Sequence, residues 1–186
     1  MKRFLSFLLL LTVVFAIEAQ QLGDRHGRRH GERPRKPAVE LIHMAETYEK
    51  GEVLYGKYYF EYFYKELNPT DTSENCVIIY LHGNSGRNRP GRECLTNRPL
   101  KAIEDYMLSQ GTKGVVIAPH CPADADWKDI SGGIMNVVDS IVQRYNVDKS
   151  RIYLIGTSFG AGGAATLLSE YPDTFAGALL ASGGRK

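Results

Sequence analysis

Four short apolar runs, separated by helical patterns, constrain the fold of this chain more than any other feature of its sequence. The runs at 76–82, 114–119, 151–156 and 176–182 are almost continuously apolar, which is typical of strands buried on both faces of a sheet. Between them, 99–110 and 130–145 have apolar residues at helical spacing, and 159–171 is a Gly- and Ala-rich helical pattern. This alternation predicts an α/β fold with a mostly parallel, doubly wound sheet and helices on both faces.

Two further patterns precede the first buried run. Residues 38–50 have apolar residues at helical spacing and predict a short helix. Residues 53–66 are dense in Tyr and Phe, as strands are. Because the aromatic residues occupy both parities, this segment is either a strand packed on both faces or part of a bent hairpin.

The first nineteen residues have the pattern of a secretory signal peptide. Lys2 and Arg3 precede an apolar run at 4–17, with the small residues Ala16 and Ala19 near its end. The alternative is an uncleaved anchor, but a spanning helix needs about 20 apolar residues. We therefore expect a secreted or periplasmic protein without a stable membrane anchor.

Residues 20–37 form a basic, flexible linker that precedes a domain at 38–186. The linker is rich in Arg, Gly and Pro and has no aromatic residue. Its His26 and His30 could bind a metal, but without Cys or a defined ligand geometry a solvated arm is favoured. The chain has 23 Lys and Arg against 21 Asp and Glu, so its charge indicates no nucleic-acid partner.

Export would place the three cysteines in an oxidising compartment. Cys94 and Cys121 could then form a disulfide, leaving Cys76 as a buried free thiol in its strand. The sequence does not determine this pairing, nor the oligomeric state.

The chemistry of the chain is indicated by a G-x-S-x-G motif, Gly156-Thr157-Ser158-Phe159-Gly160. The motif lies between a buried strand and the start of a helix, where a serine is held in a strained turn with its Oγ exposed. Gly156 and Gly160 would allow the helix and the strand to approach closely. Ser158 is therefore the candidate nucleophile, and the N–H of Phe159 is a candidate oxyanion donor.

Two other interpretations begin from the same residues. Residues 160–165 match G-x-G-x-x-A, a dinucleotide fingerprint, but the following strand lacks the carboxylate that this motif expects. A glycine-rich packing turn with an idle serine is the third interpretation.

A second motif, His82-Gly83-Asn84-Ser85-Gly86, follows the first buried run. Such a turn exposes backbone N–H groups at the carboxyl edge of the sheet, so Asn84 or Ser85 would supply a second oxyanion donor. His82 is expected to be a structural, hydrogen-bonded histidine.

Three segments, 80–87, 118–127 and 147–184, resemble the secreted branch of the α/β-hydrolase superfamily, in the same order and spacing. The likeness is to feruloyl and acetylxylan esterases, polyhydroxybutyrate depolymerases and prolyl-oligopeptidase-like hydrolases. It implies that Ser158 is the nucleophile and that Phe159 and the turn at Asn84 and Ser85 form the oxyanion hole. The chain departs from many relatives at Phe159 and Ala161, which affects the pocket rather than the role of the nucleophile.

The partners of the nucleophile are not found after it. In the resembled family an acid and then a histidine follow the serine. The only acids after Ser158 are Glu170 and Asp173, at the far end of the helix that begins beside the serine. No histidine follows Ser158. About 150 residues remain after the signal and linker, fewer than the roughly 200–250 that one such domain can occupy. We therefore expect a C-terminally truncated domain that lacks its last strands.

The resemblance implies a secreted serine hydrolase that cleaves carboxylic esters, on small-molecule, polysaccharide or polyester substrates, through an acyl-enzyme on Ser158. No metal or organic cofactor is implied. Because the chain lacks a base for Ser158, we expect negligible activity from these 186 residues alone. A non-catalytic relative that binds a polymeric ligand and a prolyl-oligopeptidase-like peptidase are the alternatives.

Overall fold

The computed structural model describes residues 38–70 and 75–182. The predicted signal peptide and linker lie outside these residues, as do the last four residues of the predicted domain.

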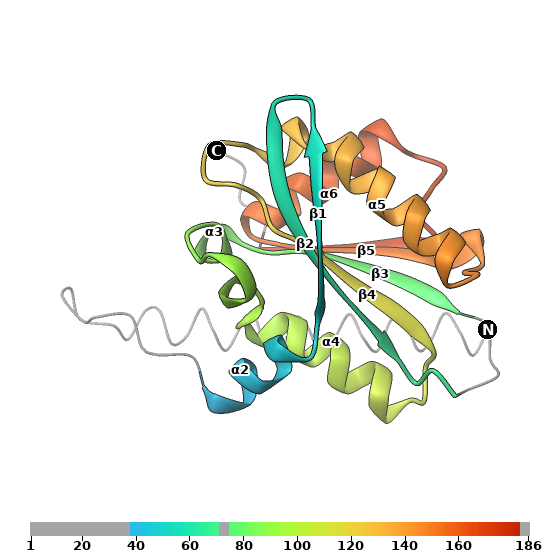
Figure 1. Cartoon of the computed structure of the whole chain (residues 1–186). Coiled ribbons are helices and arrows are strands. Elements are labelled where there is room, and N and C mark those ends of the chain that lie inside the picture. The colour runs from blue at the N-terminus through green and yellow to red at the C-terminus, as the bar shows by residue number, and fades with distance from the viewer. Residues whose placement is uncertain (1–37, 71–74, 183–186) are drawn as a thin grey trace.

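The described strands form one six-stranded mixed sheet with the order β1-β2-β4-β3-β5-β6 (Figure 1). β3, β4, β5 and β6 run parallel, whereas β2 is antiparallel to both β1 and β4. Their bounds are β1 (Glu49–Tyr55), β2 (Tyr58–Leu67), β3 (Cys76–Leu81), β4 (Gly114–Pro119), β5 (Ile152–Thr157) and β6 (Gly177–Ala181). The mostly parallel sheet confirms the predicted fold class.

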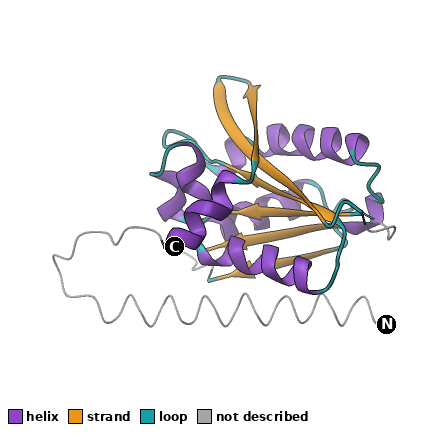
Figure 2. Cartoon of the chain, turned by 60° about the horizontal axis from the view of Figure 1, so that its bottom comes forward, coloured by secondary structure: helices purple, strands orange, loops and turns teal. Residues whose placement is uncertain are grey.

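Helices cover both faces of this sheet (Figures 1 and 2). Every residue of β3 and β4 is buried, because the strands contribute side chains to a core on each side. One core includes residues of α5 (Ser131–Arg144) and α6 (Phe159–Glu170), and the other includes residues of α2 (Val39–Glu46) and α4 (Arg98–Ser109). The shorter helices are α3 (Asn84–Arg87), η1 (Gly91–Leu95), η2 (Trp127–Asp129) and η3 (Lys149–Arg151).

The aromatic segment is a hairpin, the second of the two arrangements that its pattern allowed. β1 and β2 pair in register from Glu49–Tyr64 to Tyr55–Tyr58, and the hairpin extends beyond the helical layers (Figure 1). The short helix predicted at the start of residues 38–50 is α2, which ends at Glu46, where Thr47 donates its hydroxyl to the carbonyl of Met44. Tyr48, which the helical spacing included, lies after its end. Glu49 and Lys50 belong instead to β1, because pairing with β2 satisfies their backbone groups.

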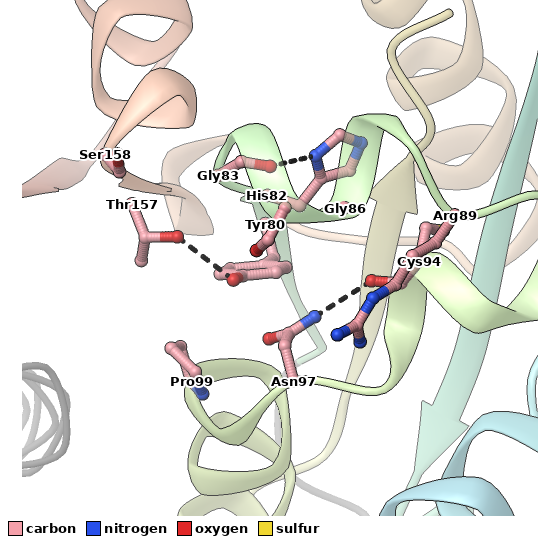
Figure 3. A pocket seen from close by; sticks show the side chains of 11 residues that line it. Tyr80, His82, Gly83, Gly86, Arg89, Cys94, Asn97, Pro99, Thr157 and Ser158 are labelled. Carbon is pink, nitrogen blue, oxygen red and sulfur yellow. Dashed lines mark hydrogen bonds between the residues drawn. The ribbon is translucent and has the colours of Figure 1, made fainter. Parts of the chain in front are cut away.

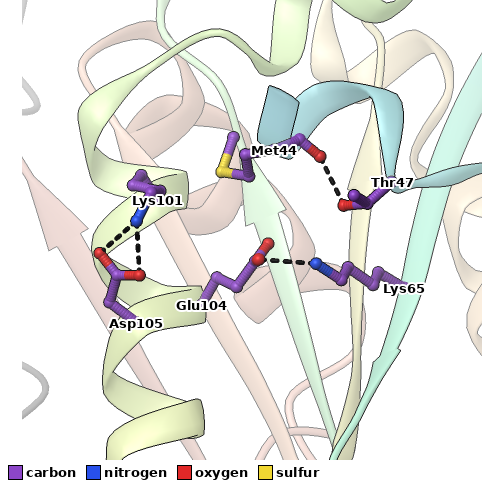
Figure 4. Close-up of polar contacts among 6 residues, drawn as sticks. All are labelled: Met44, Thr47, Lys65, Lys101, Glu104 and Asp105. Atoms are coloured by element: carbon purple, nitrogen blue, oxygen red, sulfur yellow. Dashed lines mark hydrogen bonds and ion pairs between the residues drawn. The ribbon is translucent and has the colours of Figure 1, made fainter. Parts of the chain in front are cut away.

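A buried ion pair ties β2 to α4 (Figure 4). Lys65 Nζ lies 2.6 Å from Glu104 Oε1, and the side chain of Glu104 is only 8% exposed. One turn away on the same helix, Lys101 and Asp105 form an exposed pair at the same distance. Glu104 is four residues after Leu100 and therefore lies on the buried face of α4, where its charge needs a partner.

The suggested Cys94–Cys121 disulfide is not formed. All three cysteines are buried free thiols. Cys94 belongs to the core beside α4, whereas Cys121 belongs to the core on the other side of the sheet. Burial raises the pKa of each of these two thiols to about 12, so both remain protonated. Cys76 is buried in β3, as its strand pattern predicted.

Within residues 38–70 and 75–182, no helix has the length and apolar character needed to cross a membrane.

Candidate active site

Ser158 occupies a strained backbone conformation at the junction of β5 and α6. Its φ of 53° and ψ of −113° lie outside the regions that non-glycine residues ordinarily adopt. Its N–H donates to the carbonyl of Ala181 on β6 at 2.8 Å, so the turn is anchored to the neighbouring strand. Ser158 is exposed, and such strain persists only where the surrounding structure enforces it.

The glycines on either side of Ser158 allow the close contacts that enforce this turn. A Cβ on Gly156 would lie 2.2 Å from the carbonyl oxygen of Gly160, and a Cβ on Gly160 would lie 2.0 Å from that of Leu81. No side chain fits at such distances, so both positions require glycine. Gly163, farther along α6, packs against the indole of Trp127 in the same way. Gly156 and Gly160 therefore allow α6 to lie against the sheet, and Gly163 allows it to lie against η2.

The loop after β3 lies beside the serine. A Cβ on Gly83 would be 3.4 Å from the Cβ of Ser158, which places the loop backbone in van der Waals reach. Asn84 and Ser85 begin α3, whose preceding residue is Gly83. The structure thus brings Ser158, Phe159 and the 83–85 turn together at the carboxyl edge of β3 and β5, which are neighbours in the sheet.

A small cavity lies between these elements (Figure 3). Its volume is about 40 Å³, enough for a few water molecules. Ser85 and Ser158 line it, whereas Asn84 does not. Tyr80 and Thr157 also line the cavity, and the Tyr80 hydroxyl and Thr157 Oγ1 are hydrogen-bonded at 3.1 Å (Figure 3). The remaining lining residues are His82, Gly83, Gly86, Arg89, Cys94, Asn97 and Pro99.

His82 is a structural histidine, as expected. Its Nδ1 is 2.9 Å from the carbonyl oxygen of Gly83, and its Nε2 accepts from the N–H of Cys121 at 3.1 Å. The ring therefore has its proton on Nδ1, since Nε2 is an acceptor. Burial lowers the pKa of His82 to about 4, so the imidazole is neutral at pH 7. Both nitrogens are engaged, which leaves His82 unable to take a proton from Ser158.

Trp127 is a residue of the site that the sequence analysis did not single out. Its ring is 1% exposed and has its centroid 5.0 Å from that of His82 and 5.8 Å from that of Phe159. His120 extends the cluster, 5.5 Å from His82. The indole therefore packs against both His82, which precedes the 83–85 turn, and Phe159, which follows Ser158. The available signal was a large aromatic residue shortly before the helical pattern that follows β4.

Arg87, in α3, contacts both Phe159 and the loop that follows β4. Its guanidinium lies 5.0 Å over the ring of Phe159 and donates to the carbonyls of Pro122, Ala123 and Ala125. These bonds join α3 to the loop that follows β4. The guanidinium therefore has the Phe159 ring on its face and backbone carbonyl oxygens at its N–H groups.

Neither acid that follows Ser158 approaches it within the fold. Glu170 is the last of the twelve residues of α6, which begins at Phe159, and Asp173 lies beyond the helix. A helix of this length spans about 18 Å. Among the described histidines, His120 follows β4, one strand farther from β5 than β3 is, and His43 is exposed on α2. The part of the chain that the structure describes therefore shows Ser158 without a base.

Sequence comparison finds that this chain is similar to esterases, and the match to a family model lies in its last third. Residues 123–185 match the model of the family described as Esterase PHB depolymerase. The chain is 34% identical over 135 residues to acetylxylan esterase A of Emericella nidulans, covering 65% of this chain and 41% of that protein. It is 39% identical over 51 residues to poly(3-hydroxyalkanoate) depolymerase C of Paucimonas lemoignei, covering 27% and 12% of the two chains. The chain thus spans less than half the length of these relatives.

Structural comparison agrees on the fold. A thermostable esterase superposes with a TM-score of 0.60 at 21% identity, over 76% of this chain and 42% of that chain. The sequence and structural likenesses together confirm the resemblance to α/β-hydrolase esterases. The structural superposition supports the fold class.

Proposed function

We propose, from the premise that this chain has the α/β-hydrolase fold and resembles its esterases, that it carries the nucleophile of a serine carboxylic-ester hydrolase. In this proposal Ser158 attacks the ester carbonyl and is acylated while the alcohol leaves. The observation that carries the proposal is the strained, exposed Ser158 between β5 and α6, with the 83–85 turn beside it.

The oxyanion of the tetrahedral intermediate would be bound by backbone N–H groups. Phe159 is the first residue of α6, so its N–H has no partner within the helix. The second donor would come from the turn at Asn84 and Ser85. Ser85 is favoured because it lines the cavity beside Ser158 and Asn84 does not. Such donors act where charge develops, and one donor is worth about 3 kcal/mol in comparable sites.

The size of the cavity favours esters of short acids. A volume of about 40 Å³ accommodates a few water molecules or a short acyl group, but not a long aliphatic chain. An acetyl ester fits this limit, in keeping with the name of the acetylxylan esterase relative. The esterified alcohol would lie outside the cavity, where it could belong to a small molecule, a polysaccharide or a polyester.

Turnover by the 186 residues alone should be negligible, because neither the described histidines nor the acids after Ser158 can activate its hydroxyl. His82 uses both ring nitrogens in backbone hydrogen bonds. A serine hydroxyl without a base is a poor nucleophile at neutral pH. We further propose that the protein is exported through residues 1–19, on the pattern of that segment.

Chemical rescue tests this function. Imidazole in solution supplies the base, and the rate of p-nitrophenyl acetate hydrolysis is compared between the chain and Ser158→Ala, with p-nitroacetanilide as the amide substrate. We expect no difference without imidazole and faster hydrolysis of the ester by the unchanged chain with it. Equal rates in imidazole would contradict a nucleophilic Ser158. Ser158-dependent turnover without imidazole would contradict the inactivity, and preference for the anilide would favour a peptidase.

A further inference from the structure

We propose that Arg89 binds a carboxylate on the acyl group of the substrate, inside the small cavity beside Ser158. This inference rests on the proposed function and names its substrate class, the ester of a short dicarboxylic acid that keeps one carboxylate free. Arg89 and Ser158 both line the cavity, and Figure 3 shows them on different sides of it, with the guanidinium directed towards Asn97. An ester carbonyl held at Ser158 would therefore direct a short acyl group towards Arg89.

Arg89 carries the one formal charge among the described residues that line this cavity. Two further lining side chains, His82 and Cys94, are neutral at pH 7. Burial lowers the pKa of His82 to about 4, and burial raises the pKa of Cys94 to about 12. The cavity therefore presents a single positive charge to a bound acyl group.

One edge of the Arg89 guanidinium is available to a ligand. Its Nη1 donates to the carbonyl oxygen of Thr96 at 3.0 Å and to the hydroxyl of Thr96 at 2.8 Å. Within the described residues, Nε and Nη2 donate to no protein group. The N–H groups of Nε and Nη2 are parallel, and two parallel N–H groups match the two oxygens of a carboxylate. Thr96 thus orients the guanidinium without neutralising it.

No acid is among the described residues that line the cavity. Glu61 is the acid whose charge acts on Cys94, but it lines the neighbouring groove and has Lys50 Nζ 2.6 Å from its Oε1. An ionised carboxylate in the cavity would meet the charge of Arg89 and the hydroxyl of Ser85, which can donate a hydrogen bond. A neutral acyl group would displace water from the guanidinium without replacing its hydrogen bonds, which is costly.

The volume of the cavity limits the length of the acid. About 40 Å³ holds about three water-sized atoms, and a carboxylate group has three non-hydrogen atoms. Ser158 is exposed, so the ester carbonyl can lie at the edge of the cavity while the carboxylate lies inside it. A malonyl group has one methylene between these two parts, so malonic half-esters are the ligands that this geometry fits best.

Titration followed by backbone amide NMR tests the proposal on the whole chain. The charged probe is monomethyl malonate, and its neutral isostere is methyl acetoacetate, in which a methyl group replaces one carboxylate oxygen. Acetate is the probe that has a carboxylate but no ester. At pH 7 and constant ionic strength, we expect monomethyl malonate to shift amides in 83–89 and 157–158. It should bind about tenfold or more tightly than either of the other probes.

Arg89→Gln is the variant that removes the charge, and its amide retains a donor for Thr96. The preference for monomethyl malonate over methyl acetoacetate should be lost in this variant. Arg98→Gln is the matched control, because Arg98 lies between the lining residues Asn97 and Pro99 but is exposed and does not line the cavity. The preference should persist there, since exposed charges are screened by salt.

Equal affinities of the unchanged protein for monomethyl malonate and methyl acetoacetate would contradict the proposal, and this comparison needs no variant. An equal loss of preference in Arg89→Gln and Arg98→Gln would contradict it as well. So would acetate that binds as tightly as the half-ester, or the absence of binding by all three probes. Each variant is first shown to unfold cooperatively.

The titration requires no turnover, so it separates this inference from the proposed hydrolysis. If imidazole fails to rescue hydrolysis but the anion is preferred, the nucleophilic role of Ser158 is wrong and the carboxylate site of Arg89 is supported. If imidazole rescues hydrolysis and the anion is not preferred, only the role of Arg89 is wrong.

Discussion

The imidazole of His82 donates from Nδ1 to the carbonyl oxygen of Gly83 at 2.9 Å, and Gly83 in turn lies against Ser158. A buried, neutral side chain thus holds the backbone beside the candidate nucleophile. The same ring accepts from the N–H of Cys121 and so also fixes the loop after β4. Two loops from neighbouring strands therefore depend on one uncharged histidine.

The neutrality of His82 predicts a loss of stability in acid. Its pKa is about 4 in the folded protein and about 6.5 when unfolded, so between these values the unfolded state binds more protons. The free energy of unfolding should therefore fall as the pH is lowered from about 6.5 to 4, by about 3 kcal/mol from this residue. Urea denaturation across this range measures it.

His82→Phe is the comparison for that measurement, because carboxylates also titrate in acid. The variant should be less stable at pH 7, since the Gly83 carbonyl and the Cys121 N–H lose their partner. Its stability should depend less on pH than that of the unchanged protein. Identical pH profiles would show that His82 does not titrate as described.

Two glycines of α6 should respond oppositely to alanine. Gly160→Ala places a Cβ 2.0 Å from the carbonyl oxygen of Leu81 and should destabilise the protein by about 3 kcal/mol or more. At Gly162 nothing lies within 4 Å of an added Cβ, so Gly162→Ala should stabilise the helix by about 0.5–1 kcal/mol. The midpoint of thermal unfolding, measured for both variants and the unchanged protein, tests these two opposite changes in stability. A tolerated Gly160→Ala would mean that α6 does not approach β3 as closely as described.

The two ion pairs of α4 should differ in their value. Glu104→Ala leaves Lys65 without its partner at a mostly buried site and should cost about 2–3 kcal/mol of stability. Asp105→Ala removes an equally short but exposed pair and should cost about 0.5 kcal/mol or less. Chemical denaturation of the two variants, with Lys65→Met as a second probe, gives both values. Equal costs would show that burial does not set the strength of the Lys65 pair.

Local patterns predicted the parts of this protein that local chemistry determines. The buried runs became β3 to β6, and the small residues around Ser158 predicted the close approach of α6 to the sheet. The aromatic segment was compatible with either a single strand or a hairpin, because aromatic residues stand at both odd and even positions. Such residues point to opposite faces of the sheet, and Phe60 and Phe63 accordingly belong to different cores.

Tertiary relationships were not predictable from those patterns. Cys94 and Cys121 lie on opposite sides of the sheet, and no spacing along the chain reveals this. The approach of Lys65 to Glu104, the packing of Trp127 on His82 and the stacking of Arg87 on Phe159 all join residues distant in sequence. Each requires the strand order, which the periodicity of single segments does not contain.

Acylation of Ser158 is the most direct test of the central proposal. The chain is incubated with p-nitrophenyl acetate in imidazole, quenched in acid and digested, and the acetylated peptides are identified by mass spectrometry. Ser140, which is exposed on α5, serves as the internal control for non-specific acetylation. The account predicts an acetyl group on Ser158 well above the level on Ser140, and none at that position in Ser158→Ala. Acetylation of Ser158 no greater than that of Ser140 would contradict it.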